Sequence, residues 1–466
     1  MNDRKAIDAP LEEFLMRERT LRYRLWQALL LILFSVIAAV FFATLALGGK
    51  GKDADMFERF AYNVADGPRF ARRLFLDTVR RANPYLARAQ RFEGQAGLSA
   101  GAADDGAVIL SRYDGDAKRG VVELVENATG EVLHAWRPDI RAINARSKLP
   151  AEVVNLSRDF PARRYVLHHP YAFDDGSLLF HGMGSPLVRI DACSRVMWTL
   201  DGDFHHSIER DADGHFWTAE NLHPPTLHNV DAKFEDNAIT RFSAEGAVLF
   251  RKSVGQILID NGLRHLIYSN ETYETDPIHI NDVQPVQADG PYWRKGDVFL
   301  SLRHLSMVAL YRPSTNEIVW SKQGPWMMQH DVDIVSDHEI AIFNNDAMAT
   351  PHGPKTRGAS AITVYDFAAD AMREPFRAGF EKHSIRTETA GLFRLLPGGA
   401  VMVEEHDYGR LLAIDAGGAL RWTFINRAPK DGRVFQLGWS RFLAKDRAGK
   451  LEDAVAAAAC GAPQAP

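Results

Sequence analysis

Five polar side chains of the chain belong to types that handle negatively charged oxygen atoms: His206, His279, Asn281, Arg303 and His330. Imidazole can act as a nucleophile, an acid or a base, and guanidinium presents a fork of donors that matches anionic oxygens. Transfer of a sulfuryl or phosphoryl group needs a nucleophile in line with the leaving oxygen, donors on the other oxygens, and an acid for the leaving group. Three histidines, an amide and an arginine can fill these roles without a metal if the fold brings them together.

The fold expected to bring them together is built from a unit that recurs six times after about Gly106. Each unit contains a hairpin, from VVELVENATGEVLHAW at Val121 to LLAIDAGGALRWTF at Leu411, and a short strand that precedes the hairpin. With one further strand, each unit has four antiparallel strands, which is typical of a propeller blade. A closed ring gives every blade a neighbour and leaves no long exposed edges. The sequence therefore predicts an all-β fold, a six-bladed β-propeller of four-stranded antiparallel blades.

The blade topology predicts which side chains meet near the axis, because the innermost strand of a blade starts on the face of the disc where the second strand ends. Counting from the turns that open the second strands places four residues at the starts of innermost strands: His168, His206, Asn281 and His330. The ends of the second strands carry Asn221, Arg303, Asn345 and Glu405. Strand ends on a rigid scaffold are where binding and catalytic groups concentrate.

Structural roles are the alternative for each of these side chains. His330 could bond to a neighbouring strand, and Asn281 could cap a turn. Arg303 could instead form an ion pair with Glu404, Glu405 or Asp333. The doublet His205-His206 leaves open which imidazole faces the axis, because successive strand side chains point to opposite faces, although the register favours His206. Loop or core roles are equally open for His168, His181 and His406, which could otherwise line the mouth of the site. Blade packing is expected for Trp136, Trp198, Trp320 and Trp422.

Four segments resemble the arylsulfotransferases that act without a nucleotide sulfate donor: HHSIERDADG at His205, IHINDVQPV at Ile278, GDVFLSLRHLSMVALY at Gly296 and QHDVDIVSDHEIAIFNND at Gln329. The resemblance implies a six-bladed propeller in which a phenolic sulfate ester passes its sulfuryl group to a histidine and then to a phenol. It implies that His330 is the nucleophile and Arg303 the transition-state arginine. The groups that hold the sulfuryl oxygens or shuttle the proton would be His206, His279 and Asn281.

The expected reaction is ping-pong sulfuryl transfer through a covalent sulfohistidine, with a small aryl sulfate as donor, a phenol as acceptor, and no cofactor or metal. His330 attacks the donor ester, Arg303 and His279 stabilise the developing charge, and His206 protonates the leaving phenolate. Substrate-binding roles are expected for Asn281, His205, Asn345 and His406.

Two other functions remain open from the sequence. Several axial histidines could bind one metal, as in a propeller oxygenase or lactonase, because neutral imidazole suits iron, copper and zinc. The propeller could also be a non-catalytic binding module anchored to a membrane. A net charge of -5 and a pI near 6.4 argue against a nucleic-acid partner. Two cysteines, Cys193 and Cys460, are too few for a disulfide framework and lack the spacing of a zinc site, and whether they pair is left open.

The N-terminal region predicts a membrane anchor. The run from Leu25 to Leu47 carries no charge, and about 20 apolar residues suffice to cross a bilayer. It is longer than a signal-peptide core, so we expect an uncleaved signal anchor in the inner membrane. Four arginines at positions 17–24 predict a cytoplasmic N-terminus and a body on the periplasmic or extracellular side. The expected regions are residues 1–24 in the cytoplasm, 25–47 in the membrane, 48–95 as an amphipathic helical stalk, 96–445 as the catalytic propeller, and 446–466 as an Ala-rich tail. The sequence does not set the oligomeric state.

Overall fold

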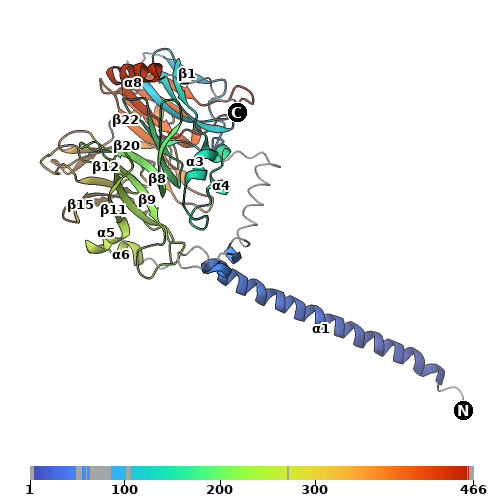
Figure 1. Cartoon of the computed structure of the whole chain (residues 1–466). Coiled ribbons are helices and arrows are strands. Elements are labelled where there is room, and N and C mark those ends of the chain that lie inside the picture. Colours follow the sequence, from blue (N-terminus) through green and yellow to red (C-terminus); the bar gives the residue numbers. More distant parts are fainter. Residues whose placement is uncertain are drawn as a thin grey trace. The chain divides into compact units, whose positions relative to one another are not determined.

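The computed structural model describes residues 5–48, 55–58, 60–62, 64, 85–100, 106–269, 272–458 and 460. The chain divides into two compact units, Met1–Val79 and Arg80–Pro466. Figure 1 shows a long helix in the first unit and the β-sheets of the second.

The first unit contains helix α1 (Lys5–Gly48). Its stretch Leu21–Leu47 has 27 residues with a mean hydropathy of 2.8, and none of its most apolar part is buried. At about 1.5 Å per residue, such a helix exceeds the roughly 30 Å hydrocarbon layer of a bilayer. This apolar helix could be a membrane anchor or a signal sequence. Helix α1 begins before the expected span of residues 25–47, because residues 5–24 belong to the same helix.

Much of the expected stalk lies outside the described residues. Its C-terminal part, residues 85–95, is described and forms no helix, which corrects the prediction there. The backbone N–H of Ala87 donates to the carbonyl of Val434, and that of Arg88 donates to the carbonyl of Asp407. This segment therefore bonds to the β-sheet unit, and these N–H groups are not available for a helix.

The second unit is mostly β and propeller-like, and its strands pair antiparallel. One four-stranded sheet has the order β26 (Arg441–Ala444), β2 (Gly106–Asp114), β3 (Arg119–Glu126), β4 (Val132–Trp136). A second has the order β12 (Ile280–Pro285), β13 (Val298–Leu302), β14 (Met307–Arg312), β15 (Glu317–Gln323). A third has the order β16 (Val332–Ile334), β17 (Glu339–Asn344), β20 (Ala361–Asp366), β21 (Ala371–Arg373).

Two larger sheets complete this arrangement. The five-stranded sheet has the order β1 (Gly97–Ala100), β25 (Leu420–Ile425), β24 (Arg410–Ile414), β23 (Val401–Glu405), β22 (Leu392–Leu395). The seven-stranded sheet has the order β11 (Val248–Ser253), β10 (Asp236–Phe242), β9 (Phe216–Leu222), β8 (Val196–Arg210), β7 (Ser185–Ile190), β6 (Leu178–His181), β5 (His168–Ala172). A small sheet joins β18 (Ala347–Met348) to β19 (Lys355–Thr356). Four of these sheets are blade-like, whereas the seven-stranded sheet is not a single four-stranded blade.

Short helices fill the connections between strands. They are α3 (Ile140–Arg146), α4 (Leu156–Asp159), η1 (Ala162–Arg164), α5 (Val254–Asp260), α6 (His265–Tyr268), α7 (Arg377–Lys382) and η2 (His406–Tyr408). The longer helix α8 (Lys445–Ala457) follows the last strand, β26. The start and the end of the unit meet in two sheets, because β26 pairs with β2 and β25 pairs with β1.

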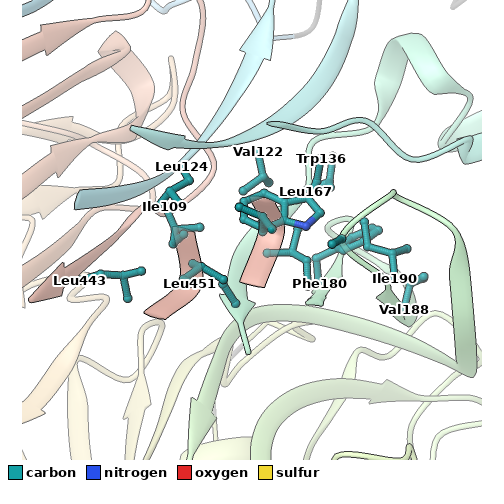
Figure 2. Close-up of a cluster of buried hydrophobic side chains, with 14 of the residues drawn as sticks. Ile109, Val122, Leu124, Trp136, Leu167, Phe180, Val188, Ile190, Leu443 and Leu451 are labelled. Carbon is teal, nitrogen blue, oxygen red and sulfur yellow. The ribbon is translucent and has the colours of Figure 1, made fainter. Parts of the chain in front are cut away.

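Helix α8 occupies part of the segment expected to be an Ala-rich tail. Its buried Ala448, Leu451 and Val455 belong to a core cluster with side chains of β2, β3, β6 and β7. Figure 2 shows Leu451 among these side chains. Full burial of one leucine stabilises a fold by about 1.5–3 kcal/mol. Beyond α8, Cys460 forms a disulfide with Cys193, with the two Cα atoms 5.2 Å apart.

Candidate functional site

Backbone irregularities occur where the expected axial residues lie. The pairing register shifts between His168 and Tyr171 in β5, between His205 and Ile208 in β8, and between Ile280 and Asp282 in β12. Such bulges turn side chains away from their regular alternation and are frequent beside active sites. His206 and His279 also have positive φ angles of 61° and 51°. Positive φ is costly for these residue types, by about 1–3 kcal/mol each, and such residues cluster at functional sites.

Three of the expected catalytic histidines come together. The ring centroid of His206 lies 5.2 Å from that of His279 and 6.4 Å from that of His330. His205 contacts this group through His206, because the two Nδ1 atoms are 2.7 Å apart and share a hydrogen bond. Of the two neighbouring rings, that of His206 faces His279 and His330, because its centroid lies 5.2 and 6.4 Å from theirs. Burial and the neighbouring histidines lower the pKa of His206 well below its ordinary value, so the ring is neutral.

The hydrogen bonds of His330 define its tautomer. The amide nitrogen of Asn345 donates to the carbonyls of Thr387 and Ala390, at 2.8 and 2.7 Å. The Asn345 Oδ1 atom must therefore be the acceptor in its 2.7 Å bond to Nδ1 of His330, so Nδ1 carries the proton. The lone pair is then on Nε2, which accepts the backbone N–H of Ala390 at 2.8 Å. Burial and the charge of Arg303 lower the pKa of His330 well below its ordinary value, which keeps the ring neutral.

Asn345 is thus placed differently from its expected role in substrate binding. Both N–H bonds of its amide are used by protein carbonyls, and the side chain is fully buried. Its observed contact is with the expected nucleophile.

Arg303 lies near His330, and its guanidinium retains free donor capacity. Its Nη1 donates to Nε2 of His304 at 2.8 Å, and Nη2 contacts the sulfur of Met328 at 3.5 Å. Its Nε is buried and has no hydrogen-bond partner among the described residues. Burial lowers the pKa of Arg303, although Asp276 and Asp407 oppose the shift.

The acidic partners considered for Arg303 are bound elsewhere. Glu404 accepts the backbone N–H groups of Trp439 and Ser440, Glu405 pairs with Arg91 and Arg410, and Asp333 pairs with Arg394.

Asp276 and His304 belong to the site although sequence reasoning did not single them out. One carboxylate oxygen of Asp276 bonds to Nδ1 of His279, and the other accepts the His279 backbone N–H at 3.0 Å. The ring of His304 stacks on that of His279 with centroids 4.4 Å apart. Burial raises the pKa of Asp276, but the two histidines outweigh burial and leave it lowered. The available signal was proximity in sequence, because Asp276 precedes His279 by three residues and His304 follows Arg303.

Asn281 bonds across to the next sheet and still has a free acceptor. Its amide nitrogen donates to the carbonyl of Gln329 at 2.8 Å, and its buried Oδ1 has no partner among the described residues. The bond to Gln329 holds the segment before β16, so Asn281 has a structural contact in addition to any role toward substrate.

Trp439 connects the site to a second group of histidines. Its ring centroid lies 6.1 Å from that of His206, 6.4 Å from that of His330 and 4.9 Å from that of His168. His168 in turn contacts His181 and His406, at 5.9 and 6.2 Å between centroids. His406, expected to bind substrate, therefore lies beside His168 in this second group. Sequence reasoning missed Trp439. It lies two residues before β26, a position similar to those of Asn281 and His330 at the starts of β12 and β16.

Three sets of side chains within the described part have ligand atoms close enough to hold a metal, within 4.8 Å of one another. They are Asp276, His279 and His304; Asp211, Asp213 and His215; and His338, Glu339 and Asp366. In the first set Arg303 donates to Nε2 of His304, so Nδ1 of this neutral ring carries the proton and donates to the Asp276 carbonyl at 2.6 Å. In this arrangement Nδ1 of His304 has no lone pair for a metal.

The sheets define a propeller-like protein, and the guanidinium of Arg303, with its unpaired Nε in the described part of the chain, is a group suited to anionic oxygens. The sequence model of the family Arylsulfotransferase (ASST) matches residues 169–427, more than half of the chain. The chain therefore belongs to the arylsulfotransferase family, which confirms the resemblance and indicates an arylsulfotransferase-like enzyme with small-molecule substrates. No curated protein sequence matches the chain significantly.

Solved structures show distant similarity. A protein of unknown function from Bacteroides caccae is 13% identical with a TM-score of 0.44, over 71% of this chain and 98% of that one. The Pan2 WD40 domain of Neurospora crassa is 10% identical with a TM-score of 0.37, over 71% and 84%. Virginiamycin B lyase from Staphylococcus aureus is 12% identical with a TM-score of 0.33, over 58% and 94%.

Proposed function

We propose that this protein transfers a sulfuryl group from a phenolic sulfate ester to a phenol, through a covalent intermediate on His330. The observation that carries the proposal is the neutral His330 ring with its lone pair on Nε2, beside an arginine with free donors and a histidine–aspartate pair. These are the nucleophile, the anion-binding group and the proton donor that transfer requires.

In the first half-reaction, the lone pair on Nε2 of His330 attacks sulfur and the bond from sulfur to the aryl oxygen breaks. Before the attack, Nε2 of His330 accepts the backbone N–H of Ala390. As the new bond to sulfur forms, this N–H turns to a sulfuryl oxygen. The Nδ1 proton stays on His330 and remains bonded to Asn345. Arg303 donates to the sulfuryl oxygens and offsets their charge.

His279 is the group that gives its proton to the leaving phenolate in this proposal, in place of the role first assigned to His206. A carboxylate beside an imidazole can offset the positive charge of the ring that holds two protons, and Asp276 stands in that position. His206 is buried and neutral, so it donates or accepts a hydrogen bond but is a weaker acid catalyst. In the second half-reaction, His279 takes the proton of the acceptor phenol, the phenol oxygen attacks sulfur, and the electron pair returns to Nε2 of His330.

We infer that the sheets form a ring of six blades. The seven-stranded sheet consists of two four-stranded sets, β5–β8 and β8–β11, that share the long strand β8. Together with the four blade-like sheets this makes six, and the pairing of β26 with β2 completes one blade from both ends of the unit.

We infer further that α1 anchors the protein in the inner membrane and that the catalytic unit faces the periplasmic or extracellular side. The disulfide between Cys193 and Cys460 supports this side, because disulfides persist in oxidising compartments. Protease treatment of intact and broken cells tests the orientation: degradation of the catalytic unit only after the inner membrane is opened would contradict it.

The central experiment is mass spectrometry of the full-length, detergent-purified protein after mixing with para-nitrophenyl sulfate without an acceptor. We expect a burst of nitrophenol about equal to the amount of protein and a labile sulfuryl group on the peptide that contains His330. The His330→Asn variant should form no adduct, and its matched control is His338→Asn, the same exchange at a partly exposed histidine bonded to Asp337. An adduct on another residue would contradict the role of His330, and the absence of both burst and adduct would contradict the function.

A further inference from the structure

His304 lies between the backbone of Asp276 and the guanidinium of Arg303. Arginine is a donor only, so the 2.8 Å contact between Nη1 of Arg303 and Nε2 of His304 makes Nε2 an acceptor. The other ring nitrogen, Nδ1, is 2.6 Å from the carbonyl oxygen of Asp276 and donates its proton there. His304 therefore has one defined tautomer, set by two partners on opposite sides of the ring.

A third contact fixes the plane of the ring. His304 stacks on His279 with an interplanar angle of 30°. The same residue, Asp276, bonds to His279 through its carboxylate and to His304 through its carbonyl. The proton donor and the arginine are thus oriented from one point in the chain.

Arg303 has few other constraints at its end. Its Nη2 contacts the sulfur of Met328, and its Nε is without a partner in the described part of the chain. The bond to His304 is consequently the strongest protein contact that orients this guanidinium. Burial, His279 and the charge of Arg303 lower the pKa of His304 despite Asp276, which keeps the ring neutral and able to accept.

We propose that His304 is a positioning residue for sulfuryl transfer: as a neutral acceptor anchored on the Asp276 carbonyl, it aims the free donors of Arg303 at the sulfuryl oxygens. This inference rests on the proposed function, because it assigns Arg303 to the sulfuryl group. A displacement of about 1 Å in a catalytic group can reduce the rate by about a hundredfold, so the effect on turnover should be large.

Two substitutions separate the acceptor from the stacked ring. His304→Phe keeps a ring against His279 but removes the acceptor, whereas His304→Gln loses the ring but can accept from Arg303 and donate to Asp276. We expect kcat for aryl sulfate transfer to fall about 10- to 100-fold in His304→Phe and to stay within about threefold in His304→Gln. The reverse order would show that stacking, and not the acceptor, matters.

A double-mutant cycle shows whether His304 acts through Arg303. In an Arg303→Met background, His304→Phe should cause less than about a twofold further loss, because the group that it positions is gone. Equal losses in both backgrounds would overturn the proposal. Thermal unfolding of every variant identifies losses that come from misfolding.

A measurement independent of turnover separates this inference from the proposed function. In full-length protein labelled with 15N-histidine, the ring shifts of His304 should report a protonated Nδ1 and an unprotonated Nε2, and they should change in Arg303→Met. A proton on Nε2 in the wild-type protein would overturn the inference even if sulfuryl transfer is observed. If the 15N shifts are as expected but the protein transfers no sulfuryl group, the proposed function is contradicted, whereas the hydrogen bonds from Asp276 through His304 to Arg303 are supported.

Discussion

The two ends of the innermost strands differ in how their buried polar groups are satisfied. His206 and His330 lie at one end. Glu209 and Asp333, each three residues further along the same segment, lie at the other end. Burial lowers the pKa of the two histidines and raises that of Asp333, so desolvation acts at both ends. Burial alone therefore does not distinguish a functional end from a structural one.

The acidic end uses its carboxylates to hold neighbouring sheets together. Asp282 in β12 accepts the backbone N–H of Val332 in β16, and Asp331 accepts that of Phe393 in β22, both at 3.0 Å. Arg394 pairs with Asp333 at 2.7 Å.

At the histidine end, several buried groups have no partner among the described residues: Arg303 Nε, Asn281 Oδ1 and Trp439 Nε1, whereas of the acidic-end carboxylates named above only Asp282 has such an atom, its Oδ1. Buried polar atoms are normally paired, so unpaired ones grouped around the proposed nucleophile indicate a place for a polar ligand. Substitutions at this end should affect chemistry, and those at the acidic end should affect stability.

The largest effect is expected for His330→Asn. Removal of a nucleophile can cost more than about a thousandfold in kcat, because binding groups cannot replace the covalent step. Asn is also polar, so we expect the loss of two hydrogen bonds to destabilise the fold by no more than about 1–3 kcal/mol. Turnover and urea unfolding of the same preparation check both parts, and wild-type turnover in a folded variant would remove His330 from the mechanism.

Arg303→Lys should have the next largest effect, a fall in kcat of about a hundredfold. Lysine keeps the charge but not the planar fork of donors, and one lost oxyanion donor costs about that much. Steady-state kinetics with a series of aryl sulfates measures the effect. If lysine supports turnover as well as arginine, the guanidinium serves only as a diffuse positive charge.

Asp282→Asn tests the acidic end through the pH dependence of stability. Burial and the charge of Glu209 raise the pKa of Asp282 to about 8 in the folded protein, whereas an unfolded carboxyl titrates near about 3.9. Unfolding between these values releases a proton, so the Asp282 contribution to stability falls as pH rises from about 4 to about 8.

Asparagine has no titrating proton at this position, so the free energy of unfolding of the variant should decline by up to about 3–4 kcal/mol less than that of the wild type between about pH 5 and about pH 8. Urea titrations at the two pH values measure the difference, and sulfuryl transfer should change less than about tenfold. Parallel pH curves for the two proteins would mean that the Asp282 carboxyl is ionised in the fold.

The smallest effect is expected for the wild-type protein as pH is lowered from about 7 to about 5. A free histidine loses its nucleophilic form near about pH 6.5, but burial and Arg303 lower the pKa of His330, so the lone pair persists at acid pH. Rapid-quench measurement of adduct formation should therefore show no decline with a midpoint near 6.5. Such a decline would place His330 in a solvated environment, unlike the buried one described.

The sequence predicted the candidate site more completely than the partners within it. His206, Asn281 and His330 were found because blade repeats place strand starts at equal offsets. Asp276, His304 and Trp439 were missed because they occupy loop or strand-flanking positions whose contacts depend on distant residues. The pairing of Cys193 with Cys460 was left open for the same reason, since the two lie 267 residues apart in the chain.

By itself the sequence determined the apolar N-terminal helix, the β-rich repeats and membership of the arylsulfotransferase family, because hydrophobic pattern and local motifs are read along the chain. Only the tertiary structure decided which side of each bulge a histidine faces, that Asn345 holds His330 in one tautomer, and that Arg303 bonds to His304. A bulge breaks the two-residue alternation of a strand, and a hydrogen bond between sheets depends on atoms that meet only after folding.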